Sequence, residues 1–358
     1  MIVNLLTRLR LRSVLCAALL AGALPLLAVT VGAQTFEHLY GPSGVKAGAV
    51  RQGELGSCYF HSSVAALANV YPDVLTKAIA PSPQGGYLVQ FATGPAETVY
   101  PEDVEFARER NFDVSEGPWV AVLLRGYAQR TLRRAMVKAV DDAPVFLALA
   151  KPVALSVLDQ SGPLMLAYDR AIRVVVSQNG SFDRTSLKTQ LAHQFSALGV
   201  PAAQAEAVST VLDQVGLFEI LGKVVRENGE VFGAYRAIGQ GGLPARVLAA
   251  FQGTAYIGEM GKSDLMEQLQ NLHAGKIAMV AGTPNSGGTP PASVIAMGSR
   301  PDWFRPGHAY TVLDYDASDN TVILRNPWGH APDPDGVFKL PVPVFQKVYD
   351  AYFFSTAK

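Results

Sequence analysis

Cysteine and net charge are both scarce in this sequence. Its 358 residues include two cysteines, and 30 basic side chains balance 30 acidic ones, for a formal net charge of +0. Two cysteines cannot build a multi-bridge disulfide scaffold or supply the Cys/His set of a structural zinc site. A neutral chain also lacks the basic field that non-specific nucleic-acid binding requires. Nucleic acid is therefore not an expected partner.

Charged residues are few as well, at 17% of the chain, whereas hydrophobic residues make up 49%. This composition excludes a disordered chain, because disordered chains are poor in apolar side chains. The length allows one large domain or two to three small domains with a sizeable core. A globular, catalytic protein is the class that remains.

The N-terminus has the pattern of an export signal. Three arginines at 8–12 precede an apolar run at 14–31, and small residues follow it up to residue 33. This order is typical of a signal peptide that is removed after export. The alternative is an uncleaved anchor, because the run approaches the length that spans a bilayer; Gly22 and Pro25 within it favour cleavage. We expect residues 1–33 to be the signal peptide, a mature chain that is periplasmic or secreted, and membrane contact only through the signal.

Cleavage leaves Cys58 as the single cysteine of the mature chain. A lone cysteine in an exported protein is either a buried small hydrophobe or a thiol kept for its reactivity. Apolar residues at helical spacing follow in 60–68, which predicts a helix that begins at Cys58. The free N–H groups and dipole at a helix N-terminus lower the pKa of a thiol. The position therefore favours a reactive thiol.

A thiol nucleophile needs a base and a group that orients the base. Among six histidines, His308 stands out because it begins an alternating strand pattern, and a second strand at 321–325 ends at Asn326. A hairpin of these strands places His308 beside Asn326, whose carbonyl oxygen can hold one ring N–H while the other ring nitrogen faces the thiol. His61, on the helix of Cys58, is expected to be a packed or surface residue rather than the base.

Two further side chains fit this chemistry. The Gln52 amide can donate to an oxyanion that forms beside the sulfur of Cys58. Trp328 can shield the bond between His308 and Asn326 from water.

Three blocks carry a resemblance to a known family: Q-G-E-L-G-S-C-Y-F at 52–60, G-H-A-Y-T-V at 307–312 and L-R-N-P-W-G at 324–329. In this order they resemble the catalytic blocks of calpain-type cysteine proteases, which share the papain-like fold. Weaker similarity covers other pieces of the mature chain: 86–91 with 97–99, 119–128, and 235–253.

The resemblance implies roles for individual residues. Cys58 is the expected nucleophile, His308 the base and then the acid, and Asn326 the orienting group. Gln52 and the backbone N–H of Cys58 form the expected oxyanion hole. Gly307 matches a position where such enzymes let the substrate backbone approach, although a glycine before a strand is equally typical of a turn.

The spacing of the blocks predicts an insertion. Cys58 and His308 lie 308 − 58 = 250 residues apart, whereas papain-like enzymes place the histidine about 130–150 residues downstream. Similarity is interrupted at 129–234, which accounts for the surplus. Helical patterns fill that segment at 131–140, 164–177, 185–198 and 202–226, the last with an expected break at Gly216. The expected domains are a first catalytic subdomain at 34–128 and 235–258, the helical insertion at 129–234, and a second catalytic subdomain at 259–358.

The calcium apparatus of animal calpains is not matched. Arg236 follows Tyr235 where the animal enzymes have a glutamate, and a cation cannot ligate calcium. Asp333 and Asp335 lie in a proline-containing loop typical of a solvated turn, and no EF-hand loop is present. We expect a calcium-independent or weakly calcium-dependent enzyme with no cofactor and no resident metal.

The sequence thus predicts an α+β, two-lobed papain-like fold, with a flexible surface loop at 282–291. The predicted activity is that of a cysteine endopeptidase acting on protein or peptide substrates; no oligomeric state is indicated. Transglutaminase-like acyl transfer remains an alternative, although it usually employs an aspartate where this chain has Asn326. A catalytically idle module that binds peptides is the other alternative.

Overall fold

The structure is a computed structural model that describes two compact units. The larger unit comprises Gln34–Ser82, Gly86–Tyr127 and Ile238–Lys358, and the smaller comprises Met1–Ala33, Pro83–Gly85 and Ala128–Ala237. The described residues are 38–83, 85–142, 152, 167–168, 170–172, 174–175, 183–216, 218, 233–262, 264–285, 304–330 and 335–357. The expected signal peptide and Asp333 lie outside them.

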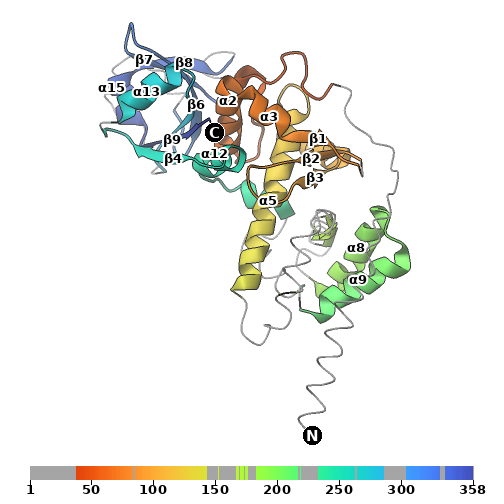
Figure 1. Ribbon diagram of the computed structural model, residues 1–358. Coiled ribbons are helices and arrows are strands. Elements are labelled where there is room, and N and C mark those ends of the chain that lie inside the picture. The colour runs from red at the N-terminus through yellow and green to blue at the C-terminus, as the bar shows by residue number, and fades with distance from the viewer. Residues whose placement is uncertain are drawn as a thin grey trace. The chain divides into compact units, whose positions relative to one another are not determined.

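The larger unit mixes helices with antiparallel sheet, and is therefore an α+β structure. A six-stranded sheet has the order β4-β9-β5-β6-β7-β8, and a three-stranded sheet has the order β1-β2-β3 (Figure 1). The strands are β1 Ile79–Pro81, β2 Tyr87–Val89, β3 Glu97–Val99, β4 Tyr256–Glu259, β5 Ile277–Gly282, β6 Ala309–Asp316, β7 Thr321–Arg325, β8 Val337–Pro341 and β9 Ala351–Thr356.

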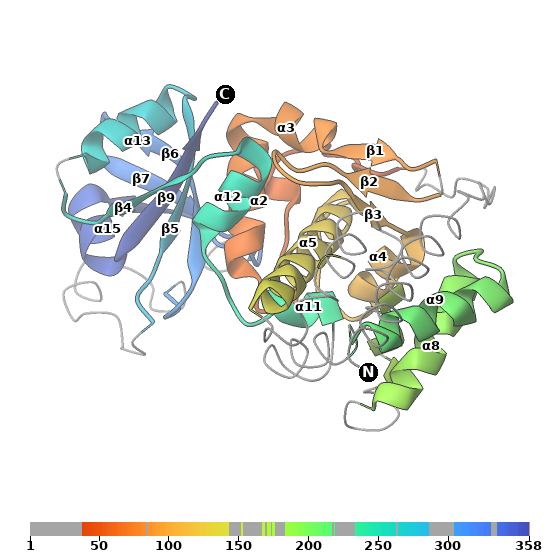
Figure 2. The same ribbon diagram turned by 60° about the horizontal axis from the view of Figure 1, so that its bottom comes forward.

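Helices cover both faces of the six-stranded sheet. Figure 1 and Figure 2 both show α2 and α12 on one side of it and α13 and α15 on the other. The helical elements that lie in the larger unit, or begin or end there, are η1 Ala47–Ala49, α2 Cys58–Val70, α3 Pro72–Lys77, α4 Pro101–Glu109, α5 Trp119–Asp141, α11 Gly233–Ile238, α12 Pro244–Gln252, α13 Leu265–His273 and α15 Val342–Val348. No helix among the described residues is both long and apolar enough to cross a membrane.

The central strand β5 is apolar from Ile277 to Ala281 because both of its faces are covered. Alternate residues of a strand point to opposite faces, and Met279 belongs to the buried cluster that includes Leu269 of α13. The other face packs against α2. The sheet thus presents buried apolar residues to α2, the helix that begins at Cys58.

Several elements expected from the sequence are present in the larger unit. A helix begins at Cys58 and a hairpin joins β6 to β7, as expected. The strand pair after the first helix is also present, as β2 and β3 in antiparallel register with Tyr87 opposite Val99.

In the smaller unit, the described part of the expected insertion is helical. Helix α8, Arg184–Ala197, begins where the Asp183 carboxylate accepts from the N–H of Ser186 at 2.7 Å. Helix α9 spans Ala202–Gln214 and packs against α8. The expected helix at 131–140 is not a separate element, because α5 runs without interruption from Trp119 to Asp141.

Two further expectations concern segments of which the structure describes only a part. The loop expected to begin at residue 282 starts later, because Gly282 is the last residue of β5; residues 286–291 lie outside the described part. The break expected at Gly216 in the pattern at 202–226 is confirmed, because α9 ends at Gln214 and Gly216 has φ +76°. Residues 217 and 219–226 of that pattern lie outside the described residues.

Candidate active site

The structure places Cys58 as the first residue of α2, half-buried. The backbone N–H groups of Ala309, Tyr59 and Cys58 itself lower the pKa of its thiol. These groups favour the thiolate, as expected at a helix start. Burial nevertheless outweighs them and raises the pKa of the thiol above its ordinary value. Our expectation of a lowered thiol pKa is therefore wrong. Burial destabilises the thiolate by more than the backbone N–H groups stabilise it.

His308 directly precedes β6, and Asn326 directly follows β7. The ring Nε2 of His308 lies 3.1 Å from Oδ1 of Asn326, which is the contact expected from the hairpin. The backbone N–H of Trp328 also donates to this Oδ1, at 3.2 Å. Because an N–H must meet an acceptor, this bond identifies Oδ1 as the oxygen of the amide. Nε2 therefore carries a hydrogen, and Nδ1 keeps its lone pair.

The His308 ring lies among aromatic side chains. Its centroid is 4.9 Å from that of Trp328 and 4.8 Å from that of Tyr310. Its pKa is lowered to about 4, chiefly by burial; the hydrogen bond to Asn326 raises the pKa, and the Arg305 guanidinium lowers it. The imidazole is neutral at neutral pH, and the role of Trp328 in shielding its bond to Asn326 from water stays a prediction.

Reciprocal hydrogen bonds join the helix of the thiol to the strand of the histidine. Ser62 lies one helical turn after Cys58, and its Oγ donates to the carbonyl of Ala309 at 2.7 Å. In return, Oγ1 of Thr311 donates to the carbonyl of Ser62 at 3.0 Å. All these groups are buried. The sulfur therefore sits against the residue that follows His308.

A second set of bonds fixes the backbone of His308. Its N–H donates to Oγ1 of Thr283 at 2.9 Å, and its carbonyl accepts from the N–H of Thr283 at 2.9 Å. The preceding Gly307 has φ +59°, and a Cβ there would lie 2.8 Å from Oδ1 of Asn285. Gly307 is thus required by the turn itself, and its expected role in substrate approach stays a prediction.

Gln52 is buried in the loop before α2. Its backbone N–H donates to the carbonyl of Pro327 at 2.8 Å, which ties this loop to the segment after Asn326. Its side-chain Nε2 donates to the carbonyl of Leu55 at 2.7 Å, which occupies one of the two amide hydrogens. The oxyanion role predicted for Gln52 therefore depends on the second hydrogen.

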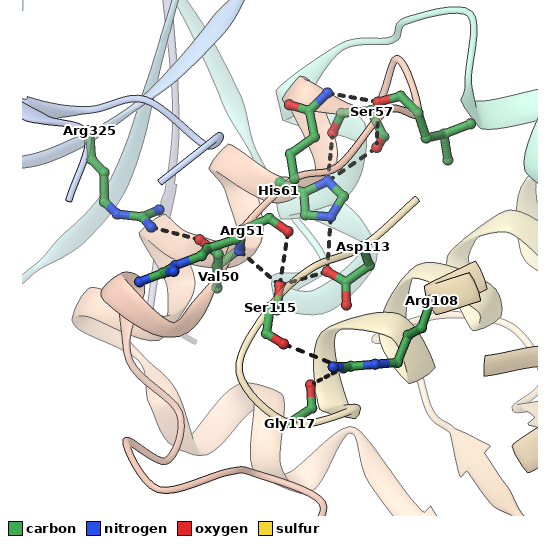
Figure 3. Close-up of polar contacts among 11 residues, drawn as sticks. Val50, Arg51, Ser57, His61, Arg108, Asp113, Ser115, Gly117 and Arg325 are labelled. Atoms are coloured by element: carbon green, nitrogen blue, oxygen red, sulfur yellow. Dashed lines mark hydrogen bonds and ion pairs between the residues drawn. The ribbon is translucent and has the colours of Figure 1, made fainter. Parts of the chain in front are cut away.

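Arg325 supports the same loop from the strand of Asn326. Its Nη2 donates to the carbonyl of Val50 at 2.7 Å (Figure 3). The pKa of this guanidinium is lowered to about 10, chiefly by burial and also by nearby Arg51, whereas Asp335 raises it. The residues on either side of the expected triad member Asn326, namely Arg325 and Pro327, thus both hold the loop that leads to Cys58.

The sequence did not point to Ser62, Thr311 or the polar partners of His61. Ser62 carries a weak signal, because it is a polar residue on the helical face of Cys58. His61 is packed, as one of our two alternatives held, and its ring contacts Asp113 (Figure 3). No local periodicity relates positions 61 and 113.

The described residues contain no group of three or more His, Cys, Asp or Glu side chains that could hold a metal ion. Asp335 is exposed, and it acts on Arg325 through its charge.

Comparison with known proteins identifies no relative by sequence. No family model matches the chain, and no curated protein matches it. Among solved structures, PepW from Lactobacillus rhamnosis HN001 is 10% identical, with a TM-score of 0.28 over 87% of this chain and 80% of that one. A likeness this low bears on neither fold nor function.

Loss of the Ser62 hydroxyl should loosen the junction between α2, which begins at Cys58, and β6, which follows His308. In Ser62→Ala we expect the second-order rate of Cys58 alkylation by iodoacetamide to fall severalfold and the free energy of unfolding to fall by about 1–2 kcal/mol. Ser63→Ala is the matched control, because Ser63 is equally buried on the same helix but bonds to the carbonyl of Tyr59. Equal alkylation rates in the two variants would contradict the docking role of Ser62.

The buried neutral imidazole of His308 should make folding sensitive to acid. Its pKa is about 4 in the folded state and 6.5 ordinarily, so between these values the unfolded chain binds more protons and stability falls as the pH falls. At pH 5 we expect this loss to reach about 2 kcal/mol relative to pH 7. Urea unfolding at both pH values would measure it. His308→Gln should lose that much less, and an identical pH dependence in wild type and variant would refute the assignment.

Proposed function

We propose that the larger unit is a papain-like cysteine endopeptidase of the calpain type, with Cys58, His308 and Asn326 as its triad. The observation that carries this proposal is the hydrogen bonding around Asn326. Because Oδ1 accepts from both Trp328 N–H and His308 Nε2, the lone pair of the imidazole is left on Nδ1. A base in this state, beside a half-buried thiol, suits nucleophilic catalysis.

Both reacting groups are neutral at rest, because burial raises the pKa of the Cys58 thiol and lowers that of His308. We propose that proton transfer to Nδ1 of His308 accompanies attack of the sulfur on a peptide carbonyl. A C–S bond forms and the carbonyl oxygen takes the negative charge. The Cys58 N–H and the Gln52 amide would donate to that oxygen.

Collapse of this intermediate breaks the C–N bond. The proton on His308 passes to the departing amine, and the acyl group stays on sulfur as a thioester. Water then gives a proton to His308 and attacks the thioester, and the returning proton restores the thiol as the acid product leaves. Asn326 holds the ring through both proton transfers, while Trp328 and Tyr310 keep water from its faces.

The two alternatives make different demands on the site. Acyl transfer to an amine would use the same thioester, but it usually employs an aspartate, and here the third member is Asn326. An idle peptide-binding module would need no oriented base, whereas His308 has one tautomer fixed by a backbone N–H. Both features favour the hydrolase.

We further propose export of the chain through residues 1–33, with proteins or peptides as substrates. Residues 129–234 would serve substrate choice or restraint rather than the chemistry, since the three triad residues all belong to the larger unit.

Cleavage of casein by residues 34–358, with and without calcium, tests this function. We expect cleavage by wild type to persist in chelator and to fall about a thousandfold or more in Cys58→Ala. Product analysis by mass spectrometry would measure new N-termini.

The variant His273→Gln is a suitable control, because His273 is an exposed histidine in an ion pair with Asp314. Retained cleavage in Cys58→Ala would refute the proposal. Incorporation of a fluorescent amine without new N-termini would favour acyl transfer. Absence of both reactions, together with no labelling of Cys58 by a peptide electrophile, would favour the binding module.

A further inference from the structure

A buried polar chain lies beneath the start of α2. Nε2 of His61 is 3.2 Å from Oδ1 of Asp113, and both side chains have 0% exposure. On the other side of the ring, Nδ1 is 3.1 Å from Oγ of Ser57 and 3.1 Å from the carbonyl oxygen of Ser57 (Figure 3). His61 thus connects a carboxylate to the residue before Cys58.

The donors and acceptors of these side chains define the hydrogen bonds of the network. Asp113 Oδ1 also accepts from Oγ of Ser115 at 2.6 Å. Since a carboxylate only accepts, Nε2 of His61 carries a hydrogen. Nδ1 lies within hydrogen-bond distance of the hydroxyl and of the carbonyl oxygen of Ser57. The Ser57 hydroxyl also lies 3.3 Å from the carbonyl of Leu55.

The residue types are those of a Ser-His-Asp triad, but their burial excludes that chemistry. Ser57 and His61 have 0% exposure and Asp113 has 1%. A nucleophile must reach its substrate, which the Ser57 hydroxyl cannot do here. The network of Ser57, His61 and Asp113 must therefore influence the chemistry through another group.

That group is the peptide bond between Ser57 and Cys58. The peptide unit is planar, so the direction of the Ser57 carbonyl fixes the direction of the Cys58 N–H. This N–H is one of the two proposed oxyanion donors. The Ser57 carbonyl accepts from the backbone N–H groups of Phe60 at 2.9 Å and His61 at 3.1 Å, and the ring of His61 adds a side-chain contact at 3.1 Å. The ring therefore acts together with the first turn of α2 in setting the direction of the donor.

The second proposed donor belongs to the same network. The carbonyl of Leu55 accepts from Gln52 Nε2 at 2.7 Å and from the backbone N–H of Ser57 at 2.7 Å. The backbones of Gln52 and Asp113 also pair as an isolated β-bridge. Asp113 thus contacts the loop before α2 through its backbone at Gln52, and α2 itself through its carboxylate at His61.

We propose that the buried His61–Asp113 pair is a positioning device for the oxyanion site, which aims the Cys58 N–H and the Gln52 amide at the tetrahedral intermediate. The proposal rests on the proposed peptidase function. Positioned donors act on the intermediate and not on the thiol alone. The pair should therefore influence peptide hydrolysis without influencing a thiol reaction that develops no oxyanion.

Alkylation by iodoacetamide is such a reaction, because it displaces iodide and creates no negative oxygen. In His61→Gln, and in Asp113→Asn, which keeps the side-chain size, we expect kcat for peptide hydrolysis to fall about tenfold to a hundredfold. KM and the alkylation rate of Cys58 should stay within about twofold of wild type. The affinity of a peptide aldehyde, whose thiol adduct places an oxygen in the oxyanion site, should fall in parallel with kcat.

His61→Asn separates the two contacts, since its amide can still reach Ser57 but not Asp113; it should retain part of the lost kcat. His273→Gln is the matched control, because the exposed pair of His273 and Asp314 contacts no proposed site residue. Urea unfolding would verify that each variant is folded, and kinetics would use folded variants only. If both His61 variants unfold, the test passes to Asp113→Asn.

Unchanged kcat in folded variants would overturn the positioning role, as would an equal fall in hydrolysis and alkylation, which a general structural disturbance produces. Failure of the wild-type enzyme to hydrolyse any peptide would overturn the proposed function, and the positioning role with it. The two failures are distinguished by the wild-type activity.

Discussion

The hydrogen bonds between Ser62 and the strand of His308 are the interaction on which the candidate site depends. Cys58 lies at the start of α2 and His308 at the start of β6, on segments far apart in the sequence. Ser62 donates to Ala309 and accepts from Thr311, so helix and strand are joined in both directions. Because these groups are buried, water does not compete for the bonds. The sheet behind them, apolar on both faces at β5, keeps the junction dry.

Exclusion of water also sets the protonation of the two groups proposed to react. Burial holds the Cys58 thiol and the His308 imidazole in their neutral forms, although N–H groups and Asn326 favour the charged ones. The N–H of Trp328 donates to Oδ1 of Asn326 and so identifies that atom as the amide oxygen. This oxygen in turn orients the ring of His308. Under the proposed mechanism, the Cys58 thiolate forms only when the substrate reacts and is not present in the free protein.

Around the reacting groups, backbone is held by side chains that take no part in the proposed chemistry. Thr283 bonds the backbone of His308, and His61 bonds Ser57. Such bonds determine the direction of N–H groups to within the narrow range that an oxyanion site requires. The residues proposed to position the donors are therefore as specific to this sequence as those proposed to react.

The sequence by itself determined the local elements: a helix that starts at Cys58, a hairpin that carries His308 and Asn326, and helices between the catalytic blocks. Periodicity and turn residues are local properties, so one chain suffices to predict them. Only the tertiary structure decided the protonation of the thiol, the continuous helix α5 and the contact of His61 with Asp113. Each of these depends on which distant segments exclude water or supply a partner, and no pattern along the chain records that.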